Sequence, residues 1–429
     1  MRMGGIDMKI AMMTNNYKPF IGGVPISVER LSQSLRKRGH EVCIFAPEYE
    51  DEYWEEDVIR YRSCEKRMKN GMAIPNILDA RINQEFRWRE FDLIHVHQPM
   101  LIGNVAVHLS RKYKIPLVYT YHTRYEEYLH YIKLFSEESG QEAIKGHILR
   151  QGKKMLPYYM ANYMKRCDMV IAPSRGMADY LRGQKIKTPV RVLPTGLAKE
   201  SFEEDKEQAE AIRKRYLGGG EHLLCTVSRL DKEKNLYFLM RCMYQLKSQT
   251  EGNVRLVVVG DGAERAGIAA YVKELGIEDV VSFIGQIPND EVRNYLQACD
   301  AFVFASKSET QGIVLAEAMA SGLPVAAISA CGVDDIVSDG CNGYLAKEDE
   351  KEFASCVAGM LSDPDNMARL KIEAKKKAEN YRMSYIAAQA EENYRRVLER
   401  REEKYGYGES QIYEKGHTVS SFLRLFKVS

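Results

Sequence analysis

Two series of short apolar segments constrain the fold of this chain more than any other feature. The first series comprises residues 8–14, 41–47, 92–97, 117–123, 168–174 and 190–196. The second comprises LLCTVSRL, VRLVVVGDG, VSFIGQI, DAFVFAS and PVAAIS, and it begins after a charged stretch at 198–215. Segments that are apolar at almost every position are typical of strands in a parallel sheet that is covered on both faces. The sequence therefore predicts two α/β domains, each with a parallel sheet and crossover helices.

The length of 429 residues is sufficient for two domains. We expect an N-terminal Rossmann-like domain over 1–197, a second Rossmann-like domain over 198–382, and a C-terminal helix and tail over 383–429 that packs back on the first domain. The final residues, SSFLRLFKVS, suit either docking on the core, which we favour, or a weak amphipathic anchor. Because ligands of open parallel sheets bind beyond the carboxyl ends of the strands, two facing domains predict a ligand cleft between them.

Composition excludes several function classes. The net charge of +2 lacks the large excess of basic residues that is typical of proteins that bind nucleic acids through their overall charge. The nine cysteines form no CxxC motif and no metal-ligand spacing, which is typical of a reducing compartment. The N-terminus lacks an apolar signal region, and no apolar run approaches the roughly 20 residues needed to span a bilayer. We expect a cytoplasmic protein whose contact with a membrane, if it has one, is peripheral.

The stretch SETQGIVLAEAMASGLPV, from residue 308, places Glu309 before an expected helix and Glu317 two turns inside it. Either Ser308 or Thr310 could cap this helix, and Gly322 would end it. The backbone N–H groups at its start, 311–313, would form an anion site supported by the helix dipole. A carboxylate beside an anion site should face hydroxyl groups, such as those of a sugar. The alternative is that Glu309 and Glu317 are solvent-exposed residues of an ordinary helix and bind no ligand.

A second glycine-rich turn follows the first apolar segment. Gly22 and Gly23 precede Pro25, which we expect at the first helical position. A turn of this kind after the first strand of an α/β domain favours close approach to a phosphate group.

Two cations, Arg229 and Lys234, lie in SRLDKEKN after the first strand of the second domain. If both point into the cleft, they suit a diphosphate, since arginine supplies a planar fork and lysine a point charge. A solvated charged turn is the alternative. The sequence GDGAERAG, at 260–267, does not match the dinucleotide fingerprint GxGxxG, and we interpret it as a strand-to-helix turn near a nucleotide base.

His122 ends a predicted strand on the cleft side and could bind a substrate hydroxyl or carbonyl group, although a structural role is the commoner one for such a residue. His95 and His97, on an earlier strand, are interpreted as packing residues. DPD at 363–365 is typical of a turn before a helix, so the sequence predicts no metal site and no cofactor.

Taken in this order, the motifs resemble those of retaining glycosyltransferases of family 4, which have the GT-B fold of two facing Rossmann-like domains. The resemblance covers roughly residues 8–394. Its most specific feature is the pair Glu309 and Glu317 with seven residues between them, supported by GGV, SRLDKEK and YHT in the expected order.

The resemblance implies a role for each matching residue. Glu309 would contact the donor sugar near the reacting centre, His122 would touch its hydroxyl face, and Glu317 would contact the ribose. The implied diphosphate ligands, from both domains, are Arg229, Lys234, the backbone of Gly312, Ile313 and Val314, and the turn at Gly22 and Gly23. The nucleotide sugar is a substrate, and the resemblance implies no metal ion.

Within the family, SETQG and YHTRYEEYLHYI look like bacterial diacylglycerol glucosyltransferases, which implies transfer of glucose from UDP-glucose to a membrane lipid. Residues 143–166 interleave basic and aromatic side chains, as expected of a surface that meets an anionic bilayer, or of an ordinary amphipathic helix pair. Two alternatives stay open within the family: a soluble acceptor, and another donor such as GDP-mannose. A nucleotide-binding dehydrogenase is the alternative from a different class.

Overall fold

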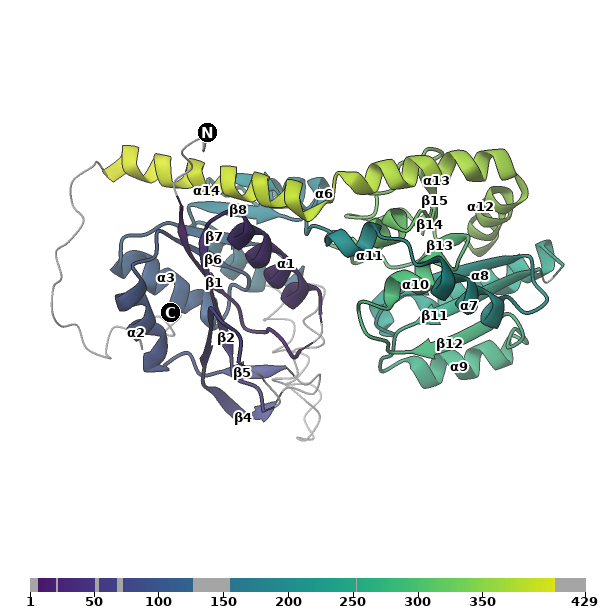
Figure 1. Cartoon of the computed structure of the whole chain (residues 1–429), viewed down its shortest axis with the longest axis horizontal. Helices are drawn as coiled ribbons and strands as arrows, with labels where there is room; N and C mark the ends of the chain where they lie inside the picture. The colour runs from purple at the N-terminus through teal and green to yellow at the C-terminus, as the bar shows by residue number, and fades with distance from the viewer. Residues whose placement is uncertain are drawn as a thin grey trace.

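The computed structural model describes residues 7–20, 22–50, 54–67, 72–125, 155–251 and 253–405. The first half of the basic segment 143–166 and all of the tail 420–429 lie outside these residues. The described chain forms two α/β domains side by side, each built on a parallel sheet with helices on both faces (Figure 1). The prediction of two parallel Rossmann-like domains is confirmed.

The N-terminal sheet has the strand order β3-β2-β1-β6-β7-β8-β9, and every neighbouring pair is parallel. The strands are β1 (Lys9–Met13), β2 (Glu41–Pro47), β3 (Val58–Tyr61), β6 (Leu93–Val96), β7 (Leu117–Thr120), β8 (Met169–Ala172) and β9 (Val190–Val192). The helices are α1 (Gly23–Lys37), α2 (Ala80–Arg89), α3 (Ile102–Lys112) and α6 (Arg175–Gly183), with a further helical stretch at 155–164. A small antiparallel pair, β4 (Ser63–Arg67) and β5 (Ala73–Pro75), stands apart from the main sheet.

The C-terminal sheet has the order β12-β11-β10-β13-β14-β15, again parallel throughout. Its strands are β10 (His222–Val227), β11 (Val254–Val259), β12 (Val281–Gly285), β13 (Ala301–Phe304), β14 (Val325–Ile328) and β15 (Gly343–Ala346). Its helices are α7 (Lys206–Leu217), α8 (Leu236–Gln249), α9 (Arg265–Glu274), α10 (Val292–Gln297), α11 (Ile313–Ala320), α12 (Glu350–Ser362) and α13 (Pro364–Glu379). Short 3-10 helices, η3 (Lys199–Phe202) and η4 (Lys232–Lys234), complete the domain.

In each sheet the strand order reverses once, between β1 and β6 in the first and between β10 and β13 in the second. Loops that leave neighbouring strands on opposite faces diverge at such a point and leave a crevice where ligands bind. Gly22 and Gly23 follow β1, Lys234 follows β10, and Glu309 follows β13. The sheet topology therefore brings three of the predicted motifs to the two switch points.

The structure differs from the sequence prediction in two places. The charged stretch 198–215, which has no strand signal and resembles a polar linker in sequence, contains η3 and most of α7, in which Ala209 is the one buried residue. A helix with so few apolar positions has no visible amphipathic period, which is why its charges suggested a linker. Strands β3, β4, β5 and β15 were not predicted, because each has at most five residues and β3, β5 and β15 are only partly buried.

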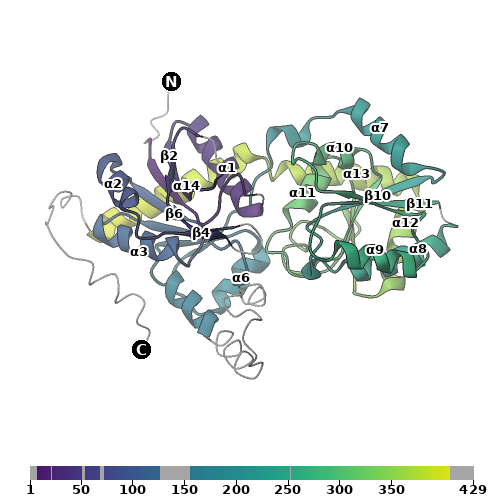
Figure 2. The same ribbon diagram turned by 90° about the horizontal axis from the view of Figure 1, so that it is seen from below.

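The last helix, α14 (Met383–Tyr405), belongs to the core of the first domain although it follows the second in sequence. Its apolar side chains pack with those of β1, β2 and α1: Ile386, Ala390, Tyr394 and Val397. Two views show α13 along the C-terminal domain and α14, in yellow, along the N-terminal domain (Figures 1 and 2). No helix in the described part of the chain is both long and apolar enough to cross a membrane.

The chain crosses between the domains twice, and the two crossings are bonded side by side. Leu197 N donates to Tyr381 O (2.6 Å), and Met383 N donates to Leu197 O (2.9 Å). At Gly196 a Cβ atom would lie 2.8 Å from Met383 Cα, closer than side chains approach. Glycine is therefore required where the outgoing and returning segments touch.

A buried carboxylate ties α14 to α1. Arg38 Nε donates to Glu391 (2.6 Å), and the Glu391 side chain is 7% exposed. Burial alone would raise the pKa of Glu391, but its contact with Arg38 holds the pKa below the ordinary value of 4.5. A carboxylate with a depressed folded-state pKa stabilises the fold above its unfolded pKa, and this contribution is lost as the pH falls through the folded value.

We expect Glu391→Ala to lower the free energy of unfolding at neutral pH by about 1–3 kcal/mol, because it leaves Arg38 without its buried acceptor. The matched control is Glu392→Ala on the exposed side of the same helix, which should change stability by less than about 0.5 kcal/mol. Thermal unfolding followed by circular dichroism measures both. The difference between the variants should shrink toward pH 4, and equal effects at pH 7 would contradict the anchoring role.

Candidate active site at the junction of the two domains

The clearest polar constellation in the second domain joins the loop after β10 to the loop after β13. Lys234, the last residue of η4, donates from Nζ to Glu309 Oε1 at 2.5 Å. The two side chains are 14% and 17% exposed. The chain then enters α8 through Asn235, whose left-handed backbone (φ 55°) ends η4 and directs the Lys234 side chain to this position. Lys234 and Glu309 thus meet at the ends of the neighbouring strands β10 and β13, and their predicted contacts with a ligand stay predictions.

Glu309 is ionised despite its burial. Loss of solvent would raise its pKa, but the Lys234 ammonium and the Ser306 hydroxyl hold the pKa below the ordinary value of 4.5. The pair therefore presents a fixed carboxylate acceptor next to a fixed cation. Such a pair can bind a neutral hydroxyl group and an anionic group at adjacent positions.

Arg229 lies in a different setting from Lys234. Its guanidinium donates to Asp231 (2.5 Å) and to Glu233 (3.0 Å), and its side chain is 58% exposed. These carboxylates belong to the same short turn, so the local sequence provides the partners of Arg229. The structure thus brings Lys234 to Glu309 and leaves Arg229 at the rim, and the diphosphate role of Arg229 stays a prediction.

The turn at 260–262 explains how the loop carrying Arg229 comes so close to β11. Gly260 has a left-handed backbone (φ 128°), and a Cβ atom there would lie 1.9 Å from Ser228 O. Leu230 N donates to Asp261 O at 2.9 Å. The glycine in this motif serves close backbone approach, in agreement with its interpretation as a strand-to-helix turn.

Helix α11 begins without a side-chain cap, which corrects the prediction that Ser308 or Thr310 would cap it. Its N-cap is Gly312, in the left-handed region (φ 73°), where glycine is favoured. Ser308 Oγ is buried without a hydrogen-bond partner among the described residues. Because no side chain satisfies the first amides of α11, those at Ile313 and Val314 are available to an anion.

Thr310 does not cap α11 because it bonds to the other domain. Thr310 Oγ1 donates to His122 O (2.8 Å), and Ser174 Oγ donates to Thr310 O (2.6 Å). The next residue, Gln311, is 6% exposed and pairs twice with Thr195: it accepts from Thr195 N (2.7 Å) and donates to Thr195 O (3.0 Å). Residues 309–312, which we name the junction loop, are therefore fixed by both domains.

Glu317 also contacts the first domain. Arg30, on α1, donates to Glu317 Oε1 (3.1 Å) and to Gly196 O (3.3 Å). Arg30 connects three elements: the helix after the glycine turn, the interdomain crossing, and α11. Sequence analysis did not identify Arg30, because an arginine within an amphipathic helix gives no signal that distinguishes it from a solvated one. The predicted ribose contact of Glu317 remains a prediction.

His122 lies two residues beyond β7, and its ring Nε2 is 2.9 Å from His97 Nδ1. Burial lowers the pKa of His122 to about 4, so the ring is neutral at physiological pH. A neutral imidazole can donate or accept a hydrogen bond at this position but contributes no charge. His95 is fully buried between Tyr394 and Thr120, as expected of a packing residue.

The glycine turn lies at the start of α1. Gly22 is the N-cap, with an extended backbone, and Gly23 is the first helical residue, so Pro25 is third rather than first. No side chain caps α1, and a Cβ atom on Gly23 would meet nothing within 4 Å. The first turn of α1 therefore leaves space beside Gly23, and its approach to a phosphate group stays a prediction.

Asp363 accepts from Asn366 N at 3.0 Å and caps α13, which Pro364 begins. DPD is therefore the turn before a helix that the sequence indicated. Within the described ranges, no group of three or more His, Cys, Asp and Glu residues could hold a metal ion.

The chain is similar to known proteins in sequence and in fold. A family model described as glycosyl transferases group 1 matches residues 207–377, and one described as glycosyltransferase family 4 matches residues 21–200. The alpha-monoglucosyldiacylglycerol synthase of Streptococcus pneumoniae is 31% identical over 83% of this chain and 79% of its own length. A GDP-mannose-dependent alpha-mannosyltransferase of Corynebacterium glutamicum is 26% identical over 83% of this chain and 81% of its own. Among solved structures, Anabaena HepE in complex with UDP covers 91% of this chain and all of its own, with a TM-score of 0.69 and 21% identity.

Removing the cation tests the electrostatics of the pair. We expect Lys234→Gln to raise the Glu309 pKa, because burial then acts without an opposing ammonium. Carbon-13 NMR of the glutamate side-chain carboxyls against pH measures the shift. Lys232→Gln, at an exposed position in the same 3-10 helix, is the matched control and should leave the titration of Glu309 unchanged. An unaltered Glu309 titration in Lys234→Gln would show that the ion pair does not set its charge.

Proposed function

The chain belongs to the family 4 glycosyltransferases, and we propose that it transfers glucose from UDP-glucose to a membrane lipid such as diacylglycerol, with retention of configuration at the anomeric carbon. The proposal of a lipid acceptor rests on the 31% identity, over most of both chains, with a protein named alpha-monoglucosyldiacylglycerol synthase. The geometry of Lys234, Glu309 and α11 supplies the chemistry.

The donor binds with its diphosphate at the start of α11 and its sugar beside Glu309. The open amides at 312–314 and the Lys234 ammonium attract the diphosphate. The Glu309 carboxylate would repel that anion if it stood alone, but Lys234 compensates its charge at 2.5 Å. Glu309 then accepts a hydrogen bond from a sugar hydroxyl group, and the neutral His122 ring contacts a second sugar oxygen.

Three further groups complete the donor site in this proposal. Gly22 and Gly23 approach the phosphates from the first domain, where no Cβ atom stands in the way at Gly23. Arg229 exchanges Asp231 and Glu233 for the diphosphate, and its side chain, 58% exposed, lies at the surface of the same loop as Lys234. Glu317 accepts from the ribose hydroxyl groups while Arg30 keeps its carboxylate in place.

The chemical step breaks the bond between the anomeric carbon and the phosphate oxygen and forms a bond from the same face to the acceptor oxygen. The acceptor proton passes to the departing phosphate oxygen. Negative charge develops on the diphosphate, and Lys234 and the α11 amides stabilise it without reorganisation. No nucleophilic side chain is needed, and the ionised Glu309 stabilises positive charge that develops on the sugar ring.

A lipid acceptor implies action at a membrane surface, and we place the enzyme at the inner face of the cell membrane as a peripheral protein. The basic and aromatic residues between 143 and 166 support this location by their composition. Within the described part of that segment, Met155 and Tyr158 are exposed and Leu156 and Tyr163 are buried. One side of this helix therefore packs on the domain, and the other carries apolar side chains in solvent.

The acceptor and the donor are tested together with purified protein. We expect a glucolipid from UDP-glucose and vesicles of diacylglycerol with anionic phospholipid, and an axial anomeric linkage in its proton NMR spectrum. GDP-mannose in place of UDP-glucose should give less than a tenth of the product. A mannolipid as the main product would refute the donor assignment. Glycosylation of a soluble acceptor without glucolipid would refute the lipid acceptor.

Turnover tests the role of Glu309. We expect Glu309→Gln to lower kcat by roughly 100-fold or more, because an amide cannot stabilise charge on the sugar ring as the carboxylate does. Glu348→Gln is the matched control: Glu348 pairs with Lys307 beside the same loop, is exposed, and should leave kcat within about twofold of the parent. UDP release measures both variants, and equal rates for Glu309→Gln and the parent would remove Glu309 from the site.

A further inference from the structure

Three histidine rings at the ends of two neighbouring strands form a row beside the junction loop, and two of them, His95 and His97, are buried. His95 lies in β6, His97 follows it, and His122 follows β7. The centroids of His95 and His97 are 4.3 Å apart, and those of His97 and His122 are 5.2 Å apart. His97, in the middle, is 1% exposed.

The rings of His95 and His97 differ in the hydrogen-bond partners of their nitrogen atoms. His95 has a hydroxyl partner on each side, with Tyr394 at 2.7 Å and Thr120 at 2.6 Å. His97 has one partner, His122, through Nδ1. Its other nitrogen, Nε2, is buried without a hydrogen-bond partner among the described residues. His95 therefore has all the bonds of a packing residue, whereas His97 is bonded only toward the site.

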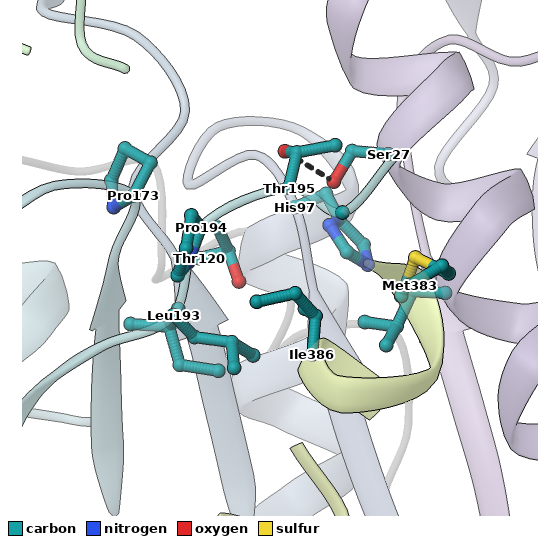
Figure 3. Close-up of a pocket in the computed structure, with 12 residues that line it drawn as sticks. Ser27, His97, Thr120, Pro173, Leu193, Pro194, Thr195, Met383 and Ile386 are labelled. Carbon is teal, nitrogen blue, oxygen red and sulfur yellow. Dashed lines mark hydrogen bonds between the residues drawn. The ribbon is translucent and has the colours of Figure 1, made fainter. Parts of the chain in front are cut away.

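A small cavity adjoins His97 (Figure 3). Its volume is about 20 Å³, and its polar lining comes from His97, Ser27, Thr120 and Thr195. Figure 3 shows His97 beside the hydroxyl pair of Thr195 and Ser27, which are 3.1 Å apart, with Met383 of α14 on the other side. A cavity of this size and polarity admits one water molecule.

The contact between His97 and His122 couples the positions of their protons. Burial lowers the pKa of both rings, so each is neutral and carries one proton. A nitrogen-to-nitrogen hydrogen bond contains one proton, so either His97 Nδ1 donates to His122 or His122 Nε2 donates to His97. In the first case both rings are protonated at Nδ1, and in the second both are protonated at Nε2.

The surroundings of His97 Nε2 favour the first case. A buried N–H group without an acceptor is rarer in proteins than a buried acceptor without a donor. A bare Nε2 can also accept from a hydroxyl group or a water molecule in the cavity. With Nε2 bare, the His97 proton is at Nδ1, and His122 must accept it at Nε2.

We propose that His97 is a positioning residue that holds His122 in the tautomer protonated at Nδ1, so that His122 offers an N–H donor to an oxygen atom of the bound donor substrate. The catalytic part of this inference rests on the proposed function, and the tautomer itself does not. An N–H donor at this position suits a sugar oxygen of the donor substrate, whose lone pairs can accept the hydrogen bond.

The experiment has a spectroscopic readout and a kinetic one. Long-range proton–nitrogen correlation spectra of the full chain labelled with nitrogen-15 histidine report which ring nitrogen carries the proton. His97→Asn and His122→Asn assign the signals. We expect both rings to be protonated at Nδ1 in the parent protein. A His122 ring protonated at Nε2 in the parent would overturn the proposal.

Variants of His97 separate positioning from packing. His97→Asn keeps a side-chain donor near the position of Nδ1 and should retain the His122 tautomer, with kcat within about fivefold of the parent. His97→Leu removes the hydrogen-bond donor to His122 and should release His122 from the Nδ1 tautomer. We expect kcat to fall roughly 10- to 100-fold, with little change in the KM for the nucleotide sugar. An unchanged His122 tautomer in His97→Leu would refute the positioning role.

Tyr394→Phe is the matched control for a lost buried hydrogen bond, because it removes a hydroxyl partner of His95 and leaves the contact between His97 and His122 in place. It should lower thermal stability without altering the His122 signals, and a change of the His122 tautomer in this variant would contradict the proposal. If the tautomers are as expected and no glucolipid forms, the proposed function fails and the assignment of the ring protons stands.

Discussion

The whole site depends on one constraint: the junction loop, 309–312, is bonded to both domains at once. Glu309 pairs with Lys234 of its own domain, while Thr310 and Gln311 bond to backbone groups of the first domain at His122 and Thr195. The relative position of the two domains therefore determines the orientation of the Glu309 carboxylate and the position of the open start of α11. A movement of one domain relative to the other must either carry this loop along or break these bonds, and either event changes the donor site.

The topology of the two sheets determines where this constraint can operate. In both sheets the strand order reverses at the first strand of the domain, so the loops after β1, β10 and β13 all reach the same junction. Glycine residues near this junction have two different tasks. Gly260 and Gly196 permit close approach of backbone segments, whereas Gly23 leaves space in front of a helix start. Only the last of these is available to a ligand.

Much of this arrangement could be predicted from local sequence, and the rest could not for a physical reason. Runs such as EVCIFAP identify buried strands by themselves, and the predicted strands place the glycine turn, Lys234 and Glu309 in the loops that follow them. The bonds from Thr310 to His122 and from Arg30 to Glu317 join residues more than 180 positions apart, as their separations of 188 and 287 show. Such contacts produce no periodicity and no cap signal, so Thr310 was mistaken for a helix cap and Arg30 was overlooked.

The position of α14 has a consequence for how the chain acquires its structure during synthesis. Residues of β1 and β2 leave the ribosome more than 300 positions ahead of Ile386, Ala390 and Tyr394, yet they share one hydrophobic cluster with them. The C-terminal domain contains all strands of its own sheet by residue 346, so its core can form before α14 has been synthesised. Nascent chains ordinarily fold from the N-terminus onward. Here the order is reversed for one face of the first sheet, which α1 covers only in part until α14 has been synthesised.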